Sequence, residues 1–114
     1  MLAIRSRNVG RVTVLELSGR LSSGEPTESF LEEVRKAAGD GKGFLLINLE
    51  GVAYMDSLGL ESLIEVYNSV KASEGEVKLL NPSAKVGELM RLTKLTSVFD
   101  IHTDEATAVK AFKG

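Results

Sequence analysis

Cysteine and tryptophan are both missing from this chain, and histidine occurs once, as His102. The absence of cysteine excludes disulfides, thiolate metal ligands and a cysteine nucleophile. With a single imidazole, a zinc site would have to be built almost entirely from carboxylates, which zinc proteins rarely do. We therefore expect neither a metal nor another cofactor. The lack of cysteine also suits a reducing compartment, so we expect a cytoplasmic protein.

Basic and aromatic residues are scarce as well. The 14 Lys and Arg residues face 16 Asp and Glu residues, for a net charge of −2, and only four Phe and two Tyr are present. Nucleic-acid-binding proteins carry basic patches and stacking platforms, so we expect no direct contact with nucleic acid. No signal-peptide core is visible and no apolar run approaches the ~20 residues that span a bilayer, so we expect no membrane insertion. The length suits one domain, residues 1–114.

A buried strand that leads into a helix lies at the centre of the sequence. Residues 44–47 are continuously apolar, which is typical of a strand covered on both faces, and Gly51 is expected to break the run. Asp56 and Ser57 are residue types that accept hydrogen bonds at a helix start, and the apolar residues of 60–70 recur at helical spacing. The sequence thus predicts the Ser57 hydroxyl at the mouth of a helix, where α/β proteins tend to build sites.

The rest of the chain alternates between strand and helix patterns. The predicted order is β-β-α-β-α-β-α-β-α, which indicates an α/β domain with a mixed, mostly parallel sheet, an antiparallel N-terminal edge strand and about four helices. Further strands are expected at 2–7, 11–18 (ended by Gly19), 76–80 and 97–101, and further helices from Pro26 to the glycine-rich turn 39–43, after an Asn81 cap, and after a Thr103 cap.

Three roles are open for Ser57 from the residues alone. Capping of the helix, together with Asp56, is the commonest role for this dipeptide. A phosphoacceptor is the second, because a helix N-terminus favours a phosphoryl group. A hydrolase nucleophile is the third, since Ser57-Leu58-Gly59 is half of a G-x-S-x-G elbow, but Met55 replaces the first glycine and His102 is the single imidazole available as a base.

The stretch Met55-Asp56-Ser57-Leu58-Gly59-Leu60 resembles the phosphorylation loop of a known family. The family that the stretch resembles is the anti-sigma-factor antagonist, or STAS, domains of bacteria. The likeness covers nearly the whole chain, and the order and spacing of its pieces are more specific than any one of them. The other matching pieces are Leu15-Glu16-Leu17-Ser18-Gly19-Arg20-Leu21, Leu80-Asn81-Pro82-Ser83, Leu92-Thr93-Lys94-Leu95 and Val98-Phe99-Asp100-Ile101.

The resemblance implies a single STAS-like domain that works by partner switching and has no catalytic activity of its own. It implies that the unphosphorylated chain binds an anti-sigma factor with serine kinase activity and thereby frees a sigma factor. Phosphorylation on Ser57 would cause release, and a phosphoserine phosphatase would reset the chain. By the same resemblance, the partner-binding residues are Asp56, Leu58, Gly59, Ser22, Ser23 and Gly24.

The chain departs from the family pattern at three positions. Leu58 stands where a small residue is usual, Ser22 where Asp is usual, and Lys94 where Gly is common. The alternative reading keeps the fold without the switch: a STAS adaptor subunit of a lipid-transport or stress-sensing complex, with Ser57 as a cap and Leu58 in a constitutive interface. The exposed edge strand and Leu58 also leave a homodimer open.

Overall fold

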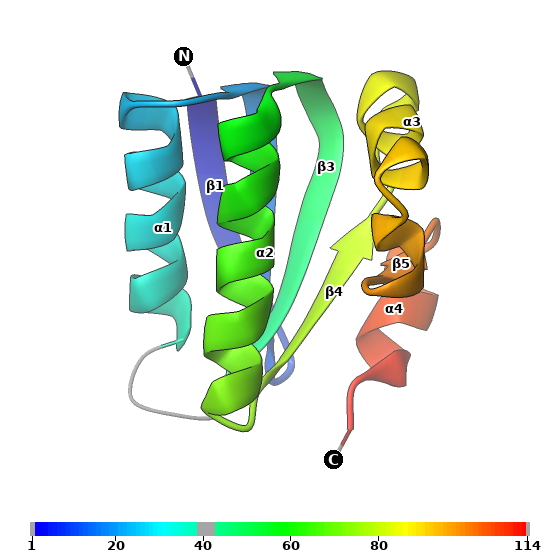
Figure 1. Ribbon diagram of the computed structural model, residues 1–114. Helices are drawn as coiled ribbons and strands as arrows, with labels where there is room; N and C mark the ends of the chain where they lie inside the picture. The colour runs from blue at the N-terminus through cyan, green and yellow to red at the C-terminus, as the bar shows by residue number, and fades with distance from the viewer. Residues whose placement is uncertain (1, 39–42, 114) are drawn as a thin grey trace.

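Five strands form one sheet in the computed structural model, which describes residues 2–38 and 43–113 (Figure 1). The spatial order follows the sequence order, with β1 antiparallel to β2 and the remaining neighbours parallel. This arrangement confirms the predicted mixed sheet and its antiparallel N-terminal edge strand. The predicted turn at 39–43 lies almost wholly outside the described residues. The strands are β1 (Leu2–Val9), β2 (Val12–Leu21), β3 (Phe44–Met55), β4 (Glu76–Leu80) and β5 (Asp100–His102).

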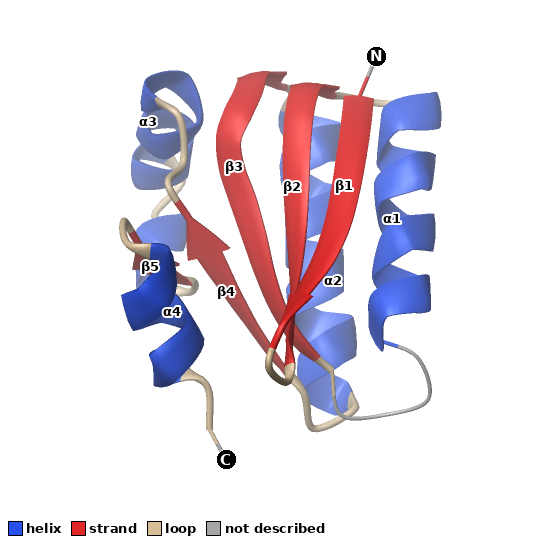
Figure 2. Ribbon diagram, turned by 180° about the vertical axis from the view of Figure 1, so that it is seen from behind, coloured by secondary structure: helices blue, strands red, loops and turns tan. Residues whose placement is uncertain are grey.

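Four α-helices cover the two faces of this sheet within the described residues. The helices α1 (Glu25–Ala38) and α2 (Ser57–Ala72) lie side by side over β1, β2 and β3. The helix α3 (Ala84–Leu92) and the short helix η1 (Leu95–Ser97) follow β4 on the same side as α2. The helix α4 (Glu105–Ala111) packs against β4 and β5 on the opposite face (Figure 2). No described helix combines the length and apolar character needed to cross a membrane.

The apolar run of β3 supplies side chains to both faces, as a covered strand requires. Leu45 and Ile47 enter the core beneath α1 and α2, where they join Phe30 and Leu63. Leu46 enters a second cluster on the other face, which is completed by side chains of α4. The members of this second cluster are Val12, Val14, Leu46, Leu80, Ala108 and Phe112.

The expectation that Gly19 and Gly51 end their strands is wrong. Both β2 and β3 continue beyond these glycines, and the pairing register between the two strands shifts next to them. Gly19 adopts φ 109°, which glycine tolerates without strain. A Cβ on Gly51 would come within 2.9 Å of the Leu17 carbonyl oxygen. The glycines therefore mark β-bulges and a close strand contact, which are other uses of glycine within strands.

Some predicted helix caps and one strand boundary also need correction. Ser83, not Asn81, is the N-cap of α3, and Asp104, not Thr103, is the N-cap of α4, where its carboxylate accepts from the Thr107 N–H at 2.9 Å. The strand expected at 97–101 is displaced, because Lys94 at φ 63° starts η1 and the paired residues begin only at Asp100.

Candidate functional site

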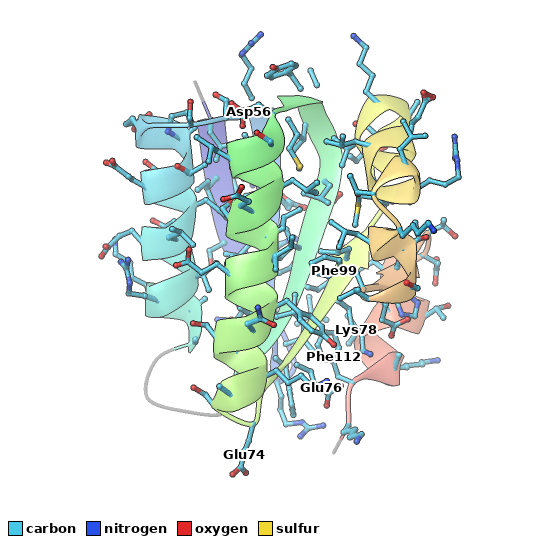
Figure 3. The ribbon with its side chains drawn as sticks, in the orientation of Figure 1. Asp56, Glu74, Glu76, Lys78, Phe99 and Phe112 are labelled. Carbon is cyan, nitrogen blue, oxygen red and sulfur yellow. The ribbon has the colours of Figure 1, made fainter. Side chains whose placement is uncertain are left out.

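The C-terminal ends of β2 and β3 place the two predicted partner-binding segments side by side. The two strands run parallel, and their last registered pair is Leu21 with Met55. The loop 22–24 leaves β2 at this edge and leads into α1, while Asp56 leaves β3 and begins α2. Parallel pairing therefore brings together segments that are more than thirty residues apart in sequence. Figure 3 labels Asp56 at the start of α2, beside the end of β3.

The Asp56 carboxylate ties these two segments together. One oxygen, Oδ1, accepts from the Gly59 N–H at 2.8 Å, as expected for an N-cap, and Oδ2 accepts from the Ser23 N–H at 3.1 Å. The backbone N–H of Gly59 first, and that of Ser23 next, hold the pKa of Asp56 below its usual range. Asp56 is thus a charged acceptor already occupied by amides from both sides of the site.

Gly59 lets the first turn of α2 lie directly on the end of β2. A Cβ at this position would overlap the Leu21 carbonyl oxygen and lie 2.9 Å from the Leu21 carbonyl carbon. Non-bonded heavy atoms do not come this close, so a larger residue at position 59 would push the first turn of α2 away from β2. The predicted site residue Gly59 therefore has a steric role, and the position of Ser57 depends on it.

Ser57 and Leu58 form the exposed part of the turn. Ser57 is the first residue of α2, so it follows the N-cap and does not share that role with Asp56. Its side chain is exposed, and no described residue forms a hydrogen bond with its hydroxyl group. Leu58 is 49% exposed, one of four large apolar side chains on the surface of the described chain. A free hydroxyl beside an exposed leucine is an arrangement that a protein partner can cover.

The loop residues differ in their exposure and contacts. Ser23 and Gly24 are exposed and Ser22 is half-buried. Gly24 adopts φ 90°, and its carbonyl oxygen accepts from the Glu28 N–H at 3.1 Å at the start of α1. The structure thus brings Ser23 into direct contact with Asp56 and places its neighbours Ser22 and Gly24 along the same loop.

Sequence reasoning missed two residues at this edge, Arg20 and Tyr54. They are registered partners on β2 and β3, and the Arg20 guanidinium lies 4.3 Å from the centroid of the Tyr54 ring. The strand residues that follow them, Leu21 and Met55, are buried in the core. No sequence signal indicated this pair, because a basic and an aromatic residue can be seen to face each other only once the strand register is known.

The geometry also separates Ser57 from the single imidazole. His102 pairs with Leu80 of β4, and Leu80 in turn pairs with Asn48 on β3. Asn48 precedes Met55 by seven residues, which is roughly 20 Å along a strand, so His102 cannot act as a base for Ser57. The His102 Nε2 instead lies 3.0 Å from the Asp100 carboxylate.

Asp100 forms a separate charged cluster on this distant part of the sheet. Its Oδ2 accepts from the Lys78 ammonium at 2.6 Å, and Lys78, foremost, together with His102 lowers the pKa of Asp100. Among the described residues, no group of three or more His, Asp or Glu side chains is placed to hold a metal ion. The charged cluster is therefore an ion-paired contact between β4 and β5.

Comparison with known proteins places this site in context. The sequence model of the STAS domain matches residues 3–108. The anti-sigma-B factor antagonist of Staphylococcus aureus is 32% identical over 71 residues, which are 62% of this chain and 64% of that protein. The chain thus spans less than two-thirds of the length of the curated relatives that it matches.

Two solved structures extend the likeness to almost all of the chain. An anti-sigma factor antagonist from Mycobacterium paratuberculosis superposes with a TM-score of 0.84 at 19% identity, over 100% of this chain and 96% of its own. An anti-sigma-factor antagonist (STAS) domain protein from Planctomyces limnophilus gives 0.79 at 25% identity, over 95% and 96%. The mixed five-stranded sheet with its four helices is the fold of these proteins.

Proposed function

Because this chain belongs to the STAS domain family, we propose that it is an anti-sigma factor antagonist whose affinity for its partner is controlled by phosphorylation on Ser57. In its unphosphorylated form it binds an anti-sigma factor that has serine kinase activity, and a sigma factor is freed. The kinase phosphorylates Ser57 and the chain is released. A phosphoserine phosphatase restores the binding form, and the chain itself catalyses nothing.

The exposed Ser57 hydroxyl at the first position of α2 is the observation that carries this proposal. It has no competing hydrogen bond within the described chain, so a kinase can reach it without first opening the structure. The edge around it combines a fixed backbone, tied by Asp56, with the exposed side chain of Leu58. The name of the Staphylococcus aureus relative supports the choice of an anti-sigma factor as the partner.

Electrostatics explains why a phosphate on Ser57 would release a partner. Phosphorylation adds about −1.5 to −2 charges at neutral pH. The neighbouring Asp56 carboxylate stays ionised, because its pKa is lowered by amide hydrogen bonds, so the new charge meets a like charge. Covering both groups with a partner would remove them from water, which is costly without cationic partners. Binding should therefore favour the unmodified hydroxyl.

Affinity capture from a lysate of the source organism tests the proposal. The baits are the wild-type chain, Ser57→Ala and Ser57→Asp, with Ser69→Asp as a matched control that adds the same charge at another exposed position of α2. We expect wild type, Ser57→Ala and Ser69→Asp to hold an ATPase of the histidine-kinase type, and Ser57→Asp to lose it. Incubation of that ATPase with ATP should phosphorylate wild type but not Ser57→Ala, as measured by intact mass.

The other outcomes identify the alternatives. Equal capture of the same partner by wild type and Ser57→Asp would contradict the switch and indicate a constitutive adaptor, in which Ser57 only begins the helix. Covalent labelling of Ser57 by a serine-directed hydrolase reagent would contradict the non-catalytic role.

A further inference from the structure

Arg20 and Tyr54 form a cation–π pair on the sheet face opposite α2. Side chains alternate along a strand, and the next registered pair, Leu21 and Met55, is buried in the core beneath α2. Arg20 and Tyr54 therefore leave the other face, which Figure 2 shows without a helix over this end of β2 and β3. The guanidinium carbon lies 4.3 Å from the ring centroid, and Tyr54 is 40% exposed.

Arg20 has no carboxylate partner among the described residues. Other arginines do: Arg7 forms ion pairs with Glu16 and Glu105, and Arg35 pairs with Glu32 at 2.8 Å. The nearest acidic residue in sequence to Tyr54 is Asp56, but its oxygens accept the Gly59 and Ser23 amides. The positive charge of Arg20 thus lies over the ring, and no carboxylate among the described residues neutralises it.

A guanidinium held over a ring is well suited to bind a carboxylate. The ring attracts the cation, and the planar group keeps N–H donors that can form two parallel hydrogen bonds with a carboxylate. The attraction of the ring also restricts the side chain before binding, so less rotamer entropy is lost when the partner arrives. Tyrosine and arginine are among the residue types that dominate the binding energy of protein interfaces.

We propose that Arg20 and Tyr54 form a docking platform for an acidic side chain of the protein that binds beside Ser57. This inference rests on the proposed function, because it assigns a chemistry to the partner at the same edge. The occupant is a protein carboxylate flanked by apolar groups, which would cover the exposed ring of Tyr54. A nucleic acid fits less well, since the chain has a net charge of −2 and acidic Asp56 lies at the same edge.

An acidic partner surface at this position would also increase the loss of affinity that phosphorylation causes. Tyr54 is three residues before Ser57, so their Cα atoms are at most ~10 Å apart, which is comparable with the ~8 Å Debye length at physiological salt. The phosphate would then repel both Asp56 of this chain and the acidic group of the partner. The platform would thus raise affinity for the unmodified chain and increase the penalty on the modified one.

Titration of the purified anti-sigma kinase onto the full chain tests this inference. The variants are Arg20→Gln and Tyr54→Leu, with Arg5→Gln as the matched control. Arg5 is an exposed arginine of β1 that also has no ion pair among the described residues. Its register partner on β2 is Glu16, which is four residues, or roughly 13 Å, along the strand from Arg20. Kd is measured by isothermal titration at two salt concentrations, and urea unfolding confirms that each variant is folded.

We expect Arg20→Gln to raise Kd about tenfold and to weaken its dependence on salt, because one charge pair is lost. Tyr54→Leu should raise Kd about threefold with the salt dependence nearly kept, and Arg5→Gln should change Kd less than twofold. An unchanged Kd for Arg20→Gln, with Ser57→Asp still releasing the kinase, would overturn the platform and leave the proposed function standing. If the wild-type chain bound no anti-sigma kinase, both the platform and the proposed function would be overturned.

Discussion

Replacement of Gly59 by alanine should destabilise this protein although alanine is the better helix former. Alanine in a helix interior is favoured over glycine by ~1 kcal/mol. At Gly59, however, the added Cβ would overlap the carbonyl oxygen of Leu21 and come within 3.0 Å of the Met55 side chain. The first of these atoms belongs to the backbone of β2, so α2 or the strand must shift. Overpacking of this kind costs ~1–3 kcal/mol or more.

Gly87→Ala supplies the matched comparison, because Gly87 also lies within a helix. The Cβ added there would have its nearest neighbour, the Pro82 Cβ, at 3.9 Å, which is an ordinary contact. The propensity gain is then realised, and we expect the free energy of unfolding to rise by ~0.5–1 kcal/mol. For Gly59→Ala we expect it to fall by ~2 kcal/mol, the overlap outweighing the propensity gain.

Urea unfolding followed by circular dichroism measures both changes. With a slope of about 2 kcal/mol per molar urea, the midpoint should fall by about 1 M for Gly59→Ala and rise by about 0.3–0.5 M for Gly87→Ala. Hydrogen exchange at the Ser23 amide should be faster in Gly59→Ala, because the shifted turn carries Asp56 away from it. A Gly59→Ala midpoint at or above that of wild type would refute the steric argument.

Two further predictions concern Lys94 and the loss of stability at acidic pH. Lys94→Gly should raise the free energy of unfolding by ~0.5–1 kcal/mol, measured in urea, because φ 63° is left-handed and favours glycine, whereas Lys94→Ala should bring no such gain. The folded-state pKa values of Asp56 and Glu105 lie below their usual ones, so the stability they contribute is complete above about pH 5 and is lost as the pH falls through those lowered pKa values. Asp56→Asn should flatten that fall in the urea midpoint; an equally steep fall would contradict the role of the carboxylate.

The sequence was most informative where the signal is local. The apolar run of β3 and the helical spacing after Leu58 predicted the strand and the helix, and Asp56 is a residue type that caps helices. The same local reasoning failed at Gly19 and Gly51, because glycine is found both at β-bulges within a strand and at the end of a strand. A glycine reveals which of the two it serves only when the neighbouring strand is in place.

The order of the strands and helices, and an exposed hydroxyl at a helix mouth, were therefore determined by the sequence itself. The tertiary structure alone decided what surrounds that hydroxyl. The contacts of Asp56 with Ser23, of Gly59 with Leu21 and of Arg20 with Tyr54 all join β2 or its loop to the end of β3 or the start of α2. They follow from the parallel register of two strands, and register is set by the packing of the whole sheet, which no short stretch of sequence encodes.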